Sequence, residues 1–343
     1  MLTALRRWIV RRTTDLSLAV APRLSADAVA AIGAALARAG MHCPVVARYV
    51  AENMQALGVY SPEALRSYFD WLGVHFAGAL NALRLARGWK SGPSPEFAAI
   101  AGEQVELDAS VGVLKSAGGG GAVLIGPHIC NYLVNLVRLS QELPLTVYLR
   151  YSKDAGRNRA KQLWYHVGGI DFICEPAGQG GRLGRLGRMA DAVRAGRVVF
   201  ITPDLPQKRD RGVPVRFFDR EIYLPGGAAA LALRTAAPLY ILLARTSGRR
   251  QVLLVRGPYA DSSGQAGARR PVGGHASSRH VELRQHLQWF ADHLVGFLRE
   301  QTPLWYMWGD KRWTRVFRGD ERYAARLATA GDDLPDAGVA GAS

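Results

Sequence analysis

The 343-residue sequence has little cysteine, few acidic residues and no long uninterrupted hydrophobic stretch. Its cysteines, Cys43, Cys130 and Cys174, lie far apart and show no Cys-x-x-Cys or mixed Cys/His spacing. A disulfide framework or a zinc site would require such spacing, so we expect neither, and the pattern suits a reducing compartment. We expect no metal ion and no other cofactor.

The longest apolar stretch, residues 222–244, is interrupted by Pro225, Gly226, Arg234 and Pro238. It therefore predicts a loop, a helix and a strand of a core rather than a membrane span. The N-terminal stretch is too short and too rich in arginine for a signal peptide or a spanning helix. We expect a protein that is soluble or peripheral on a membrane.

The N-terminus does carry a basic amphipathic pattern, "LRRWIVRR", with arginines around one apolar side. Leu5, Trp8 and Ile9 share that side. Such a helix lies on a membrane surface or packs on the core as an ordinary surface helix, and the pattern fits both.

The shortage of acidic residues leaves a formal net charge of +16, from 44 Lys and Arg against 28 Asp and Glu. Residues 150–220 hold 15 of the basic residues against 7 acidic ones, which is half of that excess. The charge favours an anionic membrane face, a phosphorylated substrate or an acidic protein, or it reflects a GC-rich genome. We expect no nucleic-acid partner, because zinc-finger spacing and RRM-type aromatic motifs are absent from the sequence.

Two patterns divide the chain. Residues 1–95 predict helices, one of which begins at Ser61-Pro62-Glu63 with an N-cap and a proline in the first turn. From about residue 105, short apolar runs bounded by Gly, Pro or Asp alternate with helical patterns. The runs are 122–126, 145–150, 170–175, 197–204, 239–245 and 251–257.

Strands buried on both faces have this composition, so the alternation predicts an α/β fold with a central, mostly parallel or mixed sheet flanked by helices. We expect a helical N-terminal region over 1–95, which is a candidate for membrane contact. An α/β domain over 96–327 and a disordered tail over 328–343 follow it.

His128 follows the first of these runs, and the end of a buried strand is a usual place for a catalytic base. A histidine of the core is the alternative. Asp204 follows another run and Pro203, where an aspartate also often caps a turn. The aromatic residues of 304–315 predict a core cluster, with an acyl-pocket wall or a membrane-interface contact as alternatives.

Four segments, taken in order, resemble the lysophospholipid acyltransferase superfamily. They are "GPHICNYL" around His128, the strand end at Arg150, residues 192–239, and "LWYMWGDKRWTR" at 304–315. The resemblance covers about residues 40–318. It is nearest to the late acyltransferases of lipid A biosynthesis (lauroyl or myristoyl acyltransferases) and their actinobacterial relatives, and it implies a glycerolipid acyltransferase-like fold.

The family has a His-x4-Asp/Glu motif in which the histidine is the general base. His128 matches that base, Asn131 the family's asparagine, and Tyr132 its tryptophan. Leu133 stands where the family has its acid.

The other segments match in the same way. Pro203-Asp204 match the start of the family's Pro-Asp-Gln, with Leu205 in place of glutamine, and Asp310 replaces a histidine near the C-terminus. The resemblance implies that His128, Asn131 and Asp204 are catalytic. It implies substrate contacts for the following residues: Tyr132, Arg150, Asn158, Pro203, Arg211, Gly212 and Arg216.

An acyltransferase of this kind moves an acyl group from a thioester on acyl carrier protein or coenzyme A to a hydroxyl or amine. The implied acceptor is a phosphorylated or glycosylated lipid or small molecule. The implied location is the cytoplasm or the cytoplasmic face of a bacterial inner membrane. The alternative is a catalytically weak or inactive homologue that binds acyl chains or an acyl carrier protein.

Leu133 leaves His128 without the carboxylate that fixes the tautomer and stabilises the imidazolium in a Ser-His-Asp triad. Asn131 and Asp204 are candidate substitutes. Asp204 serves only if its carboxylate lies within about 2.6–3.2 Å of a ring nitrogen, or is joined to it by one water. Our hypothesis is that no carboxylate contacts His128 directly, and that catalysis relies on an intrinsically reactive acceptor such as an amine.

Overall fold

The computed structural model describes residues 2–86, 88, 92–116, 120–152, 154–175, 181–260 and 276–326. The expectation of a disordered tail at 328–343 lies outside these residues. The helices are α1 Leu2–Val20, α2 Ala26–His42, α3 Pro44–Gln55, α4 Pro62–Leu85, α5 Pro95–Gln104, α6 Gly112–Ser116, α7 Tyr132–Ser140, α8 Ala155–Val167, α9 Gly181–Arg194, α10 Gly227–Thr235, α11 Ala276–Glu300 and α12 Lys311–Phe317. The strands are β1 Val105–Leu107, β2 Ala122–Ile125, β3 Leu145–Arg150, β4 Asp171–Glu175, β5 Val198–Ile201, β6 Val213–Phe217, β7 Arg220–Leu224, β8 Leu239–Ser247, β9 Arg250–Arg256 and β10 Ala324–Arg326.

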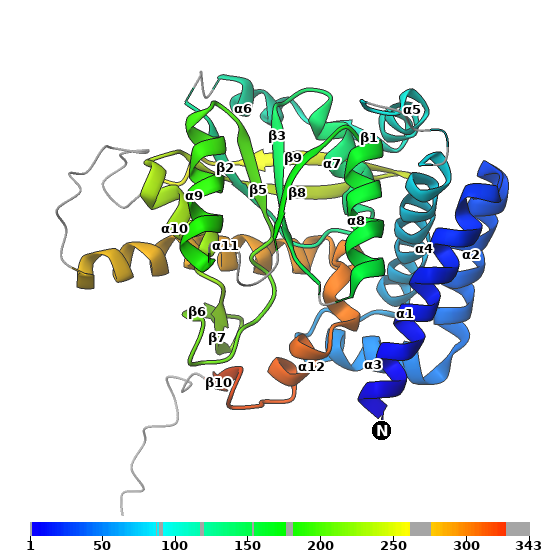
Figure 1. Cartoon of the computed structure of the whole chain (residues 1–343). Helices are drawn as coiled ribbons and strands as arrows, with labels where there is room; N and C mark the ends of the chain where they lie inside the picture. The colour runs from blue at the N-terminus through cyan, green and yellow to red at the C-terminus, as the bar shows by residue number, and fades with distance from the viewer. Residues whose placement is uncertain are drawn as a thin grey trace, which may run out of the picture.

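The N-terminal region is helical, as the sequence predicts, and it continues through α5 to Gln104. The predicted start of α4 is confirmed: the Ser61 hydroxyl accepts a hydrogen bond from the Ala64 N–H at 2.9 Å, and Pro62 is the first helical residue. Figure 1 shows α1, α2 and α4 packed together beside the sheet, on the side of α8. This region therefore covers one flank of the α/β domain.

The α/β class is confirmed by a seven-stranded sheet in the order β1-β9-β8-β2-β5-β3-β4. The six apolar runs of the sequence form β2, β3, β4, β5, β8 and β9. Neighbouring strands are parallel except β8 and β9, which are antiparallel, so the sheet is mixed. All residues of β2 and β5 are buried, which explains why these two strands read as unbroken apolar runs.

The strands β2 and β5 are neighbours at the centre of the sheet, yet the chain leaves them in opposite directions. After β2 it passes through α7 to β3, and after β5 it returns through α10 to β8 on the other side of β2. Right-handed crossovers in opposite directions put the following helices on opposite faces, which leaves a crevice at the carboxyl ends of the two strands. His128 follows β2 and Asp204 follows β5.

A second, three-stranded sheet, β10-β7-β6, was not predicted from the sequence. Strands β6 and β7 are an antiparallel hairpin, and β6 alternates buried Val213, Val215 and Phe217 with less buried residues. In Figure 1 this small sheet and α12 lie below the main sheet.

The helices give little indication of a membrane span. Among the described residues, no single helix is both long enough and apolar enough to cross a bilayer. Only α2 and α3 taken together meet that test of length and composition, and they are bent by 77° at the break between them.

Candidate active site

Two backbone hydrogen bonds fasten the loop after β2 to a distant part of the chain. The Tyr306 N–H donates to the His128 carbonyl at 2.8 Å, and the Cys130 N–H donates to the Leu304 carbonyl at 2.7 Å. Asn131, with a φ of 62°, then turns the chain into α7. The position of His128 is therefore set by the end of β2, the turn at Asn131 and the C-terminal segment.

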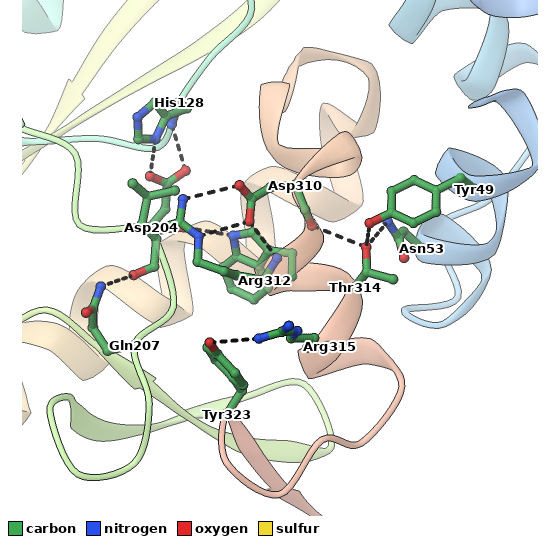
Figure 2. Close-up of polar contacts among 12 residues, drawn as sticks. Tyr49, Asn53, His128, Asp204, Gln207, Asp310, Arg312, Thr314, Arg315 and Tyr323 are labelled. Carbon is green, nitrogen blue, oxygen red and sulfur yellow. Dashed lines mark hydrogen bonds and ion pairs between the residues drawn. The ribbon is translucent and has the colours of Figure 1, made fainter. Parts of the chain in front are cut away.

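Asp204 contacts the His128 ring directly. Its Oδ1 lies 2.5 Å from His128 Nδ1, and its Oδ2 accepts the His128 backbone N–H at 2.7 Å, as Figure 2 shows. Our hypothesis that no carboxylate touches His128 is therefore wrong. Leu133, where the resemblance would have an acid, cannot supply this contact, and Asp204, 76 positions after His128, supplies it. The contact occurs because β2 and β5 are adjacent and parallel, so the residues after them meet.

The Asp204 carboxylate is completely buried, and three residues hold Asp204 through its carboxylate or its backbone carbonyl. Besides the two His128 groups, the Trp305 indole N–H donates to Oδ2 at 2.9 Å. The Trp313 indole N–H donates to the Asp204 backbone carbonyl at 2.8 Å. A buried carboxylate needs such partners, and here they also fix its direction.

These tryptophans belong to a core cluster, as the sequence predicts. The ring centroids of Trp305 and Trp313 lie 4.9 Å apart, those of Trp305 and Trp308 lie 4.8 Å apart, and all three side chains are fully buried. The sequence did not indicate that two of the indole N–H groups would hold Asp204.

The contact with Asp204 assigns the tautomer of His128. A carboxylate only accepts hydrogen bonds, so Nδ1 carries the proton and Nε2 presents a lone pair. Nε2 lies 3.3 Å from the hydroxyl oxygen of Thr202, which was not predicted as a site residue. The His128 side chain remains 18% exposed, whereas Asp204 is 0% exposed. The His128 ring is therefore partly accessible to a substrate, whereas the Asp204 carboxylate is not.

Tyr132 and Cys130 lie close to His128 in the sequence and differ in their surroundings. The Tyr132 ring lies edge-on to the His128 ring, with centroids 6.2 Å apart, and its predicted contact with a substrate stays a prediction. Cys130 is fully buried, and burial raises the pKa of its thiol far above the ordinary range. This thiol is therefore not a nucleophile at neutral pH.

Asn131 does not hold the His128 ring, and its predicted catalytic role is not supported by its contacts. The side chain is buried, and its Nδ2 donates to Gln104 Oε1 at 3.0 Å. Its Oδ1 faces Gly78 of α4, where an added Cβ would lie only 2.7 Å from that oxygen. Asn131 thus joins α4 and α5 to the start of α7.

The contacts of Asn158, a predicted substrate residue, indicate a structural role. Its side chain is buried and forms two hydrogen bonds with the backbone of Ser152, at 2.8 and 2.7 Å. It therefore holds the loop after β3. Arg150 lies at the end of β3 and is exposed, so its guanidinium is accessible.

The remaining predicted substrate residues lie on the chain between β5 and β7. Pro203 is buried between Thr202 and Asp204, while Arg211 and Arg216 are exposed. Gly212 allows a close backbone approach, because an added Cβ would lie 2.5 Å from the Cβ of Tyr223. Among the described residues, neither arginine forms a hydrogen bond or ion pair with His128 or Asp204.

Asp310, which stands where the resemblance would have a histidine, caps α12. Its Oδ1 accepts the Arg312 backbone N–H at 2.8 Å, and its carboxylate lies 3.2 Å from the Arg312 guanidinium (Figure 2). Burial raises the pKa of Asp310, but the hydrogen bonds and charge of Arg312 outweigh it, so the pKa is lowered overall. Asp310 is therefore an anion that orders α12, the helix that carries Trp313.

The described residues contain no group of three or more His, Cys, Asp or Glu side chains arranged to hold a metal ion. A cavity of 570 Å³ lies between α11 and the β8–β9 hairpin, lined by Arg245, Arg256 and Asp292 among others. Its lining includes neither His128 nor Asp204, so we do not count this cavity as part of the candidate active site.

Comparisons with known proteins do not place the chain in a family. No protein-family model matches it, and no curated protein matches it significantly.

Proposed function

We propose that this protein is an acyltransferase that moves an acyl group from a thioester to a hydroxyl or amine acceptor, with His128 as the general base. The observation that carries the proposal is the pair formed by His128 Nδ1 and Asp204 Oδ1, 2.5 Å apart, with Nε2 free of the carboxylate. In this geometry Asp204 keeps the proton on Nδ1 and stabilises the imidazolium that forms when Nε2 takes a proton.

The segments that form the site favour acyl transfer over other reactions that use a general base. Three of the four segments that resemble the lysophospholipid acyltransferases meet at one place: the loop of His128, the residues at Asp204, and the segment of Trp305 and Trp313. The fourth segment ends at Arg150 on β3, the strand next to β5.

The proposed reaction follows from these positions. The acceptor O–H or N–H binds at Nε2 and loses its proton to this nitrogen as the acceptor atom attacks the thioester carbon. When the tetrahedral intermediate collapses, the carbon–sulfur bond breaks and the thiolate takes the proton from His128. The products are the acylated acceptor and the free thiol of the carrier.

One experiment tests the proposal directly. The purified protein is incubated with acyl-coenzyme A and acyl carrier protein thioesters of several chain lengths and with hydroxyl and amine acceptors. Thiol release and acylated product are both measured. We expect transfer that His128→Ala abolishes and that His286→Ala, a change on the distant helix α11, leaves intact. Transfer that survives His128→Ala would refute the role of the base, and acyl-thioester binding without turnover would favour the inactive homologue.

A specific observation favours a second candidate, in which Thr202 is itself acylated. Its hydroxyl oxygen lies 3.3 Å from His128 Nε2, so Thr202, His128 and Asp204 are arranged as a nucleophile, a base and an orienting acid. Such an enzyme would transfer the acyl group to an acceptor or to water through a threonine ester. Mass spectrometry of the intact protein after mixing with a donor alone separates the two. An added acyl mass that Thr202→Val removes supports the ester, and an unchanged mass supports direct transfer.

We also propose that the exposed basic residues attract an anionic partner, either a membrane face or an acidic acyl carrier protein. Arg150, Arg211 and Arg216 are exposed cations on elements that follow or flank β5. Charge attraction of this kind is screened within roughly 8 Å at physiological ionic strength. We expect salt-sensitive sedimentation with anionic vesicles and none with neutral vesicles. Equal binding to both kinds of vesicle would refute the membrane arm of this proposal.

A further inference from the structure

A histidine of α4 lies beside the site although nothing in its sequence neighbourhood singles it out. Gly78 lets α4 approach the start of α7, because any Cβ there would meet Asn131 and, at 2.9 Å, a methyl group of Val134. His75 lies three residues earlier on the same helix. The close approach at Gly78 therefore brings His75 to the residues that follow His128.

The surroundings of the His75 ring place it next to the residues of the site. Its centroid lies 5.1 Å from that of Tyr132 and 4.6 Å from that of Tyr306. The Tyr132 ring in turn contacts the His128 ring, and the Tyr306 N–H donates to the His128 carbonyl. The two imidazoles are thus joined through Tyr132 and through the backbone of Tyr306.

His75 is a buried polar side chain without a partner. The residue is 8% exposed, and its Nδ1 is shielded from water and accepts or donates no hydrogen bond. No hydrogen bond to Nε2 occurs among the described residues either. Nδ1 is thus closed to a ligand. Nε2 is not among the buried unpaired side-chain atoms of the described residues, so it is the ring nitrogen that a ligand can reach.

The protonation state of His75 is set by the same surroundings. Burial, and then the nearby His128, lower the pKa of His75 to about 4, so the ring is neutral at neutral pH. An orphaned N–H is rarer in buried sites than an orphaned acceptor. Nδ1 is therefore the bare nitrogen, and Nε2 carries the hydrogen.

We propose that the Nε2–H of His75 donates a hydrogen bond to the thioester carbonyl oxygen and stabilises the negative charge that develops there during acyl transfer. This inference rests on the proposed acyltransferase function. As the acceptor atom attacks the carbonyl carbon, the carbonyl π electrons move to the oxygen, and the acceptor proton goes to His128. His75 gives up no proton in the step. A neutral imidazole suits this role, because it can donate a hydrogen bond without competing as a base.

Substitution of His75 by glutamine or by asparagine tests which of its two ring nitrogens matters. A glutamine can place its N–H₂ near the position of Nε2, an asparagine places its own near Nδ1, and a phenylalanine keeps the ring without any donor. We therefore expect His75→Phe to lower kcat by about 10²–10³-fold, as the loss of one oxyanion donor does elsewhere, with little change in KM. His75→Gln should recover most of that loss, and His75→Asn should not.

The experiment measures kcat and KM for the unmodified protein and the three variants, together with their thermal unfolding. A packing role alone would change the unfolding temperature and would give no preference for glutamine over asparagine. A kcat of His75→Phe within 3-fold of the unmodified protein, a difference below about 0.7 kcal/mol, would overturn the role assigned to Nε2. Recovery by asparagine instead of glutamine would overturn it as well. Absence of transfer by the unmodified protein would overturn the proposed function and this inference together, so the two failures are distinguishable.

Discussion

Replacing Leu133 with glutamate would put an acid five residues after His128, and we expect no gain in activity from it. The His128 Nδ1 already contacts Asp204 Oδ1, so a second carboxyl group could bond only to Nε2. That bond would occupy the lone pair with which Nε2 acts as the base. Leu133 itself is 2% exposed, in the first turn of α7, and packs in the hydrophobic core. A carboxyl group at this position would therefore be buried among apolar side chains.

The cost of that change can be worked out from the burial of Leu133. Removing a fully buried leucine side chain loses about 1.5–3 kcal/mol of transfer free energy. A buried polar group without a partner adds about 1–3 kcal/mol. The sum, about 3–6 kcal/mol, is a large share of the 5–15 kcal/mol by which domains are typically stable. Chemical denaturation should show the loss, and kcat per folded molecule should not rise.

Leu133→Gln is the matched control, because glutamine has the size of glutamate without its charge. We expect the two variants to lose similar stability and to have similar activity. A Leu133→Glu protein that stayed as stable as the unmodified one and turned over faster would refute the claim that Asp204 is the acid that orients His128.

Two further predictions concern the groups around the His128–Asp204 pair. Trp305→Phe removes a donor to Asp204 Oδ2 and should lower kcat by about 10-fold or more, since a hydrogen bond to a charged group contributes about 1.5–3 kcal/mol. Trp308→Phe, which removes a donor to the Thr302 carbonyl from an equally buried ring, should lower the unfolding temperature but spare kcat; equal losses of kcat in both would contradict this account. Burial lowers the pKa of His75 from 6.5 to about 4. As pH falls, His75 therefore takes up a proton in the unfolded chain before it does so in the folded protein. The unfolding free energy should drop for this reason by about 3 kcal/mol between pH 6.5 and 4. Unfolding free energies of the unmodified protein and His75→Phe that changed in parallel over this pH range would contradict that prediction.

The strands buried on both faces could be predicted from the sequence, because their unbroken apolar runs are a local signal. The hairpin of β6 and β7 could not be found in that way. It is half exposed, with Pro214 and Arg216 between its buried residues, so it forms no apolar run. Its alternation of buried and exposed residues was the signal that could have revealed it.

The candidate site was only partly visible from the sequence. His128 and Asp204 stood out because each follows a buried strand, but their contact depends on which strands are adjacent, and local patterns do not contain strand order. Thr202 is separated from Asp204 by Pro203 alone, and the same consideration would have found it once the strand order was known. His75 had no local signal, since its burial comes from the approach of α4 to α7 at Gly78.

The most direct test of the account is the activity of Asp204→Asn on the donor and acceptor that the unmodified protein uses. The change keeps the shape of the side chain and removes the charge that orients His128. We predict a fall in kcat of about 10⁴-fold, the loss seen when the acid of a Ser-His-Asp triad is changed in this way, in a protein that remains folded. Asp310→Asn, which changes a neighbouring aspartate that does not contact His128, should keep most of the activity. A folded Asp204→Asn protein with kcat within 10-fold of the unmodified protein, a difference below about 1.4 kcal/mol, would contradict the central claim that Asp204 is the acid of this site.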